Sequence, residues 1–92
     1  MPSVEECLQR ADEFAQEVMH VWVTQMNAGN ASALTDEFKN LSDRADDYVK
    51  AKRVADNHRT FNALSEEEAA EELKTRRAFA ETYQSFHEKH QR

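Results

Sequence analysis

The sequence predicts an all-α protein, an antiparallel three-helix bundle of up-down-up order that occupies residues 1–92 as a single domain. One glycine and one proline leave few positions for tight turns, so the helices are expected to be long. Apolar residues recur at helical spacing in three segments, and no segment alternates apolar and polar residues as a half-buried strand does. Short connections between the segments make neighbouring helices antiparallel.

The first helix is expected to begin after Ser3 and to run to about Ala28. Glu6 follows Ser3 by three residues, which is the pattern of a reciprocal helix cap. Gly29 then ends the helix, because glycine adopts the left-handed conformation in which the last free carbonyls find donors. The apolar residues form one stripe that is broad enough to contact two neighbouring helices. They are Val4, Leu8, Ala11, Phe14, Ala15, Val18, Met19, Val21, Trp22 and Met26.

The second helix is expected to begin after Asn30 as its cap, or about one turn later with Thr35 as the cap. Its apolar face consists of Leu34, Phe38, Leu41, Ala45, Tyr48 and Val49. This register then fails, because Lys52 falls at the centre of the apolar face. The sequence therefore predicts a kink or a break in residues 52–60.

The third helix has the clearest start, with Ser65 as the cap and Glu68 three residues later, and it is expected to run to near the C-terminus. Its apolar face changes direction along the helix. Ala69, Leu73 and Ala80 point one way, whereas Phe79, Tyr83 and Phe86 are rotated toward another side. The three aromatic residues are interpreted as a second apolar surface that the core does not use.

The composition predicts a soluble chain that lies in the cytoplasm. Hydrophobic residues make up 39% and charged residues 33%, and no run approaches the ~20 apolar residues of a membrane span. The N-terminal segment carries acids where a signal peptide has basic residues, and the single Cys7 cannot form an internal disulfide. A net charge of −6 argues against direct nucleic-acid binding, which depends on clustered lysine and arginine.

No catalytic, cofactor-binding or metal-binding residue is predicted, although several residues were considered for these roles. Glu17 and His20 have the spacing of a di-iron motif, but it occurs once and on the polar side of the first helix. His87 and His90 share a helix face without the spacing of zinc-protease helices. Cys7 lies at the edge of the apolar stripe and is interpreted as a packed core residue.

The segment from Lys50 to Arg59 is the one basic part of the sequence that suggests a function. It could contact an acidic partner or nucleic acid. The favoured interpretation is a solvated bend whose basic side chains pair with acids in the early turns of neighbouring helices.

These observations predict a small non-enzymatic helical protein that binds a protein partner, as an adaptor, a chaperone-like protein or a regulator. The expected contact residues are Phe79, Tyr83 and Phe86, whose spacing suits helix-in-groove binding. Replacing these rings is then expected to leave folding intact. The alternative is an acidic inhibitor or decoy that occupies a basic or nucleic-acid-binding site on a target protein. A third possibility is that the spare apolar surface forms a homodimer.

Overall fold

The computed structural model of the protein describes residues 3–30, 32 and 34–90. These residues form the helices α1 (Val4–Gln9), α2 (Ala11–Asn27), α3 (Asp36–Thr60) and α4 (Glu66–His90), with no strand among them. The prediction of an all-α fold is therefore confirmed. The up-down-up order of three helices is not confirmed, because the described residues form four helices.

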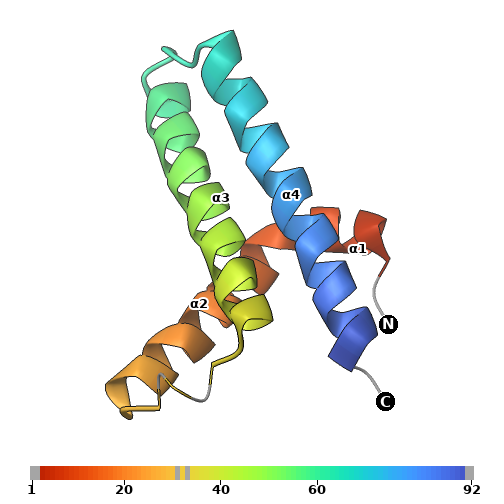
Figure 1. The fold of residues 1–92 in the computed structure, drawn as a ribbon. Helices are drawn as coiled ribbons and strands as arrows, with labels where there is room; N and C mark the ends of the chain where they lie inside the picture. The colour runs from red at the N-terminus through yellow and green to blue at the C-terminus, as the bar shows by residue number, and fades with distance from the viewer. Residues whose placement is uncertain (1–2, 31, 33, 91–92) are drawn as a thin grey trace.

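A long hairpin of α3 and α4 dominates the architecture, and its two helices run side by side in opposite directions (Figure 1). α1 and α2 cross the lower half of this hairpin, whereas its upper half has no third helix against it (Figure 1). The Cα atoms extend over 43 × 30 × 17 Å. The molecule is therefore flat and about two helix layers thick, since packed helices lie about 8–10 Å apart.

The first predicted helix is interrupted at Arg10, which has φ −108° and ψ 22°. The interruption lets α1 pack mainly against α4, while α2 packs mainly against α3. Arg76 of α4 supports the junction, because its Nε donates a hydrogen bond to the carbonyl of Leu8 at 2.7 Å. Carbonyls at the end of a helix have no partner within it, so this side chain fills a need that the interruption creates.

The predicted break in residues 52–60 is wrong, because α3 is continuous from Asp36 to Thr60. Lys52 stays near the interior because acids surround its ammonium group. Its Nζ lies 2.9 Å from Asp56 Oδ2 and 3.6 Å from Asp12 Oδ2 of α2. Ion pairing therefore allows Lys52 to lie on the apolar face without a kink in α3.

Local capping patterns place the helix starts. Thr35 and not Asn30 caps α3, since the Thr35 hydroxyl accepts a hydrogen bond from the Phe38 N–H at 3.1 Å. The cap of α4 is reciprocal as predicted. The Glu68 N–H donates to Ser65 Oγ and the Ser65 N–H donates to Glu68 Oε1, both at 3.1 Å.

The helix ends use left-handed residues. Gly29 has φ 75° and follows α2, and the Asn30 N–H then donates to the Gln25 carbonyl at 2.9 Å, which is the closing hydrogen bond of a Schellman turn. Asn62 takes the same conformation after α3, with φ 55°. The interpretation of Gly29 as the end of a helix is confirmed.

Glu68 makes the stability of the hairpin dependent on pH. Pairing with His58, whose Nδ1 lies 2.5 Å from Glu68 Oε2, is the main cause that lowers the pKa of Glu68, and the Ser65 N–H adds to it. A lowered pKa stabilises the fold above the ordinary glutamate pKa of about 4.5, and this stabilisation is lost as pH falls through the folded-state value.

We therefore expect Glu68→Gln to destabilise the protein at pH 7 and to have a smaller effect at about pH 3, because the contribution of the native carboxylate declines as pH falls below the ordinary glutamate pKa. Urea unfolding followed by circular dichroism at both pH values measures the difference. Glu67→Gln is the matched control, because Glu67 is an exposed neighbour in the same turn. An equal loss of stability at both pH values would contradict the expectation.

Candidate functional site

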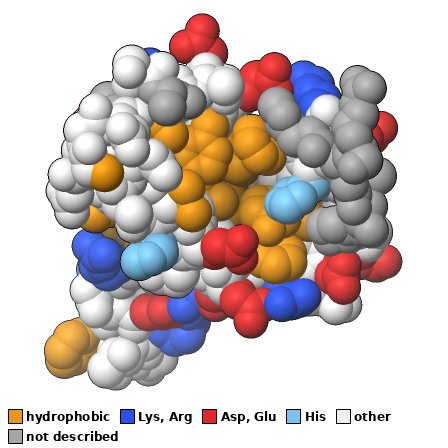
Figure 2. Space-filling model, turned by 90° about the horizontal axis from the view of Figure 1, so that it is seen from below, with side chains coloured by type: hydrophobic (Ala, Val, Ile, Leu, Met, Phe, Trp, Pro, Cys, Tyr) orange, Lys and Arg blue, Asp and Glu red, His pale blue; other side chains and the backbone are white. Residues whose placement is uncertain are grey.

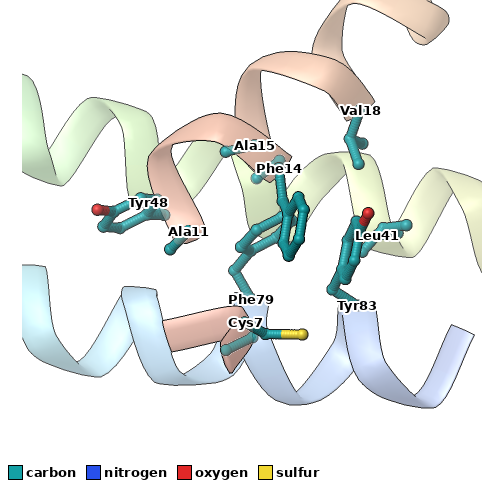
Figure 3. Packing of buried hydrophobic residues seen from close by; sticks show 11 residues of the cluster. Cys7, Ala11, Phe14, Ala15, Val18, Leu41, Tyr48, Phe79 and Tyr83 are labelled. Carbon is teal, nitrogen blue, oxygen red and sulfur yellow. The ribbon is translucent and has the colours of Figure 1, made fainter. Parts of the chain in front are cut away.

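The predicted contact residues Phe79, Tyr83 and Phe86 do not form a spare surface. Phe79 is 0% exposed and Tyr83 is 4% exposed, and the half-buried Phe86 packs against the same core. Figure 3 shows Phe79 and Tyr83 pointing from α4 toward the side chains of α2 and α3. The apolar face of α4 changes direction because α4 packs against α3 along its length and against α1 and α2 in its C-terminal half.

Leu73 corrects the sequence analysis, and Trp22 has an intermediate position that the sequence did not predict. Leu73 was placed on the core face of its helix, but it is 62% exposed because α1 and α2 do not reach this part of the hairpin. Trp22 is half-buried, and its ring stacks on Phe38 with the centroids 6.4 Å apart. The hydrophobic core therefore lies where α1 and α2 cross the hairpin. Toward the lower end of the molecule its side chains become partly exposed.

A continuous series of aromatic rings links the core to this lower end, with consecutive centroids 4.4 to 6.4 Å apart. In order from the middle outward, the rings are Tyr48, Phe79, Tyr83, His87, Phe86, Phe38 and Trp22. Burial raises the pKa of Tyr83 to about 12, so its hydroxyl stays protonated at neutral pH. These rings hold the helices together.

A buried hydroxyl joins α2 to α3. The Tyr48 hydroxyl donates a hydrogen bond to the Asp12 carboxylate, which also faces Lys52. Burial, followed by the hydrogen bond to Asp12, raises the pKa of Tyr48 well above its usual range. The hydrogen bond to Asp56 is the largest cause that raises the pKa of Lys52. Both groups keep their protons at neutral pH, so the cluster is a polar cross-link and is not suited to proton transfer.

Cys7 is fully buried in the core, as predicted. Burial is the main cause that raises the pKa of its thiol, and the charge of Glu6 adds to the effect. The reactive thiolate is therefore disfavoured at neutral pH. The local geometry gives this cysteine a packing role.

The histidines do not assemble a metal centre among the described residues, where no group of three or more His, Cys, Asp or Glu side chains could hold an ion. Glu17 and His20 are both exposed on α2. His87 is half-buried beside Tyr83, and the side chain of His90 lies outside the described part of the chain.

None of the described helices combines the length and the apolar character that crossing a membrane requires.

Part of the basic segment from Lys50 to Arg59 pairs with acids of neighbouring helices, as the favoured interpretation expected, whereas Lys50 pairs with Asp46 of its own helix. His58 contacts Glu68, and Arg59 Nη2 lies 3.5 Å from Glu72 Oε1, so both pair with acids in the early turns of α4. The expected bend is absent, because these residues belong to the continuous helix α3. His58 and Arg59 therefore link the two helices of the hairpin.

A groove of about 620 Å³ lies between α3 and α4. Small side chains contribute to it, namely Ala51, Val54 and Ala78, and its other lining residues include charges of both signs. Its balanced charge gives no preference for an acidic or a basic ligand. The groove is therefore a weaker candidate than a surface of definite chemical character.

The C-terminal half of α2 forms a surface without charged side chains. Residues 18–35 contain no Asp, Glu, Lys or Arg, although charged residues make up 33% of the chain. Val21, Val23 and Met26 are 39%, 52% and 46% exposed, and they lie on more than one side of the helix. The segment also contains His20, Thr24, Gln25 and Asn27, so it is uncharged with apolar side chains exposed between polar ones.

The surroundings of this helix half are also apolar. The end of α2, the start of α3 and the end of α4 lie at the lower end of the molecule, and they carry the half-buried Trp22, Phe38 and Phe86 (Figure 1). Figure 2 shows this end from below, with hydrophobic side chains gathered in a hollow that charged side chains border. Sequence reasoning missed this surface, although the uncharged stretch could have indicated it.

A second hollow of about 280 Å³ lies on the flank of α2 that faces α3, and we call it the α2–α3 groove. Its lining residues are Met19, Trp22 and Val23 of α2 and Ser42, Asp43 and Asp46 of α3. One wall is therefore apolar and the other wall is acidic.

Comparison with known proteins returned no match, whether to a protein-family model, to a curated protein or to a solved structure.

Proposed function

We propose that the protein binds another protein through the apolar C-terminal half of α2. The observation that carries the proposal is the exposure of Val21, Val23 and Met26 on a helix segment without formal charge. The centres of protein interfaces are depleted of charged residues and enriched in aromatic residues and methionine. Trp22, the single tryptophan of the chain, lies within this segment and suits the role of an anchor.

The location proposed for this function is the cytoplasm. Cys7 is a free cysteine in the core, and free buried thiols are compatible with a reducing compartment.

The test compares two double variants that each replace exposed apolar residues with glutamine, a good helix former. Val23→Gln with Met26→Gln changes α2, whereas Val54→Gln with Leu73→Gln changes the hairpin at 46% and 62% exposed positions. Affinity purification with each tagged chain from native cells, followed by quantitative mass spectrometry, measures the partners retained. We expect the α2 variant alone to lose its specific partner, because only that variant interrupts the docking surface.

Both variants are expected to keep their stability within about 0.5 kcal/mol, because the replaced side chains are exposed. Chemical denaturation of the purified proteins checks this condition. Equal retention of partners by the α2 variant and by the native chain would overturn the proposal.

A second candidate function is the acidic inhibitor or decoy. It is motivated by residues 1–49, which contain ten acidic and three basic side chains. The acidic run at the start of α4 gives less support, because Glu68 and Glu72 pair with His58 and Arg59. Binding driven by carboxylates alone would weaken steeply with salt, whereas binding through apolar side chains would change little. A homodimer would instead appear as a concentration-dependent mass in sedimentation.

A further inference from the structure

We infer that the partner presents a cationic amphipathic helix to the α2–α3 groove. The inference rests on the proposed function and names the chemistry of the partner. Its basis is the pairing of an apolar wall, made by Met19, Trp22 and Val23, with a wall that carries Asp43 and Asp46. A helix with apolar residues on one face and lysine or arginine beside them complements both walls at once.

The carboxylates of the acidic wall are open to a new partner. The Asp43 carboxylate makes no ion pair or hydrogen bond with any side chain that the structure describes, and Asp43 is exposed. Asp46 pairs with Lys50 at 2.8 Å, but the Lys50 side chain is 70% exposed. Such an exposed pair is weak, so a lysine or arginine of the partner can replace Lys50 beside Asp46.

Charge also favours a cationic partner over a second copy of the same chain as the occupant of the α2–α3 groove. A two-fold interface uses the same patch of both copies, so the carboxylates of Asp43 and Asp46 from both copies would enter one interface. Each copy also carries a net charge of −6. Like charges across an interface disfavour binding, whereas a cationic surface is attracted to the acidic wall.

The size of the hollow suits a few side chains as its occupants. Its volume of about 280 Å³ lies at the small end of the range of roughly 300–1,000 Å³ for ligand pockets. It suits one or two apolar anchors of a helix that lies along the groove, with anchors three and four residues apart on one face. Basic residues beside these anchors then reach Asp43 and Asp46.

The experiment uses two synthetic helical peptides of about 14 residues, long enough for roughly 20 Å of helix. One contains leucine and lysine in an amphipathic pattern, and the other has glutamate in place of lysine. Neither contains tryptophan, so the fluorescence of Trp22 reports binding directly. We expect the lysine peptide to shift the Trp22 emission to shorter wavelength with saturation, and the glutamate peptide to leave it unchanged.

Two variants of equal charge separate the groove from general attraction to an acidic protein. Asp43→Asn with Asp46→Asn is expected to weaken binding of the lysine peptide about tenfold or more. Glu66→Gln with Glu67→Gln removes the same charge from exposed positions at the start of α4, and is expected to change binding by less than about threefold. Equal weakening by the two variants, or no binding of the lysine peptide, overturns the inference.

The α2 variant distinguishes this inference from the proposed function. If Val23→Gln with Met26→Gln abolishes capture of the native partner while the Asp43 and Asp46 variant keeps it, that result would support α2 as the docking surface and would refute the cationic partner. If neither variant affects capture, both proposals fail. A dimer in sedimentation equilibrium that the α2 variant dissociates would identify a second copy as the occupant and would overturn the cationic helix.

Discussion

Replacing Phe79 with alanine is expected to lower the free energy of unfolding by about 3–5 kcal/mol, which is typical of a buried phenylalanine. Phe79 is 0% exposed and lies between Tyr48 and Tyr83, whose ring centroids are 6.4 and 5.7 Å away. Removing the ring deletes apolar burial and leaves a cavity that the tightly packed neighbours fill only in part. A domain of this size has a total stability of roughly 5–14 kcal/mol, so the variant is expected to lose a large fraction of its stability.

Urea denaturation followed by circular dichroism at 222 nm measures this loss. Phe61→Ala is the matched control, because Phe61 is 79% exposed and its replacement is expected to change stability by less than about 0.5 kcal/mol. If Phe79→Ala were as mild as Phe61→Ala, the ring would lie on the surface. That result would restore the sequence-based expectation that the aromatic residues of α4 are available to a partner.

Replacing Ala45 with leucine is expected to cost about 1–3 kcal/mol through overpacking. Ala45 is 0% exposed on α3 and belongs to a core that contains other fully buried small residues. These residues are Cys7, Ala11, Ala15 and Ala80. Small side chains let helices approach closely, so a larger side chain at such a position forces the helices apart or strains its own rotamer.

Ala70→Leu is the control for this substitution, because Ala70 is an exposed alanine within α4. Alanine and leucine have similar helix propensities, so the substitution there is expected to change stability by less than about 0.5 kcal/mol. Thermal unfolding monitored by circular dichroism compares the two variants. Equal melting temperatures for both variants would show that Ala45 has room for a larger side chain.

The proposed docking surface was harder to predict than the helices. The sequence analysis selected Phe79, Tyr83 and Phe86 because they left the stripe of their own helix. Whether a second apolar face is buried depends on where the other helices lie, and one helix pattern does not contain that information. The uncharged residues 18–35 were visible in the sequence, but the exposure of Val21, Val23 and Met26 is known only once α2 is seen to extend beyond the hairpin.

The sequence by itself determined the features that depend on neighbouring residues. Ser65 and Glu68 specify the start of α4, and Gly29 specifies the end of α2, because caps and left-handed turns need only a few consecutive residues. The absence of other glycines and prolines from the interior also required long helices.

Only the tertiary structure decided the interruption at Arg10 and the continuity of α3 through Lys52. At Arg10, contacts with two different helices outweigh the local preference for one straight helix, and Arg76 of α4 supports the junction. At Lys52, the carboxylate of Asp12 in α2 stabilises the ammonium group near the core. The pattern of α3 alone predicted that this charge would not be tolerated on the apolar face. In both cases the deciding partner is distant in the sequence, so its free energy of interaction enters only when the helices pack.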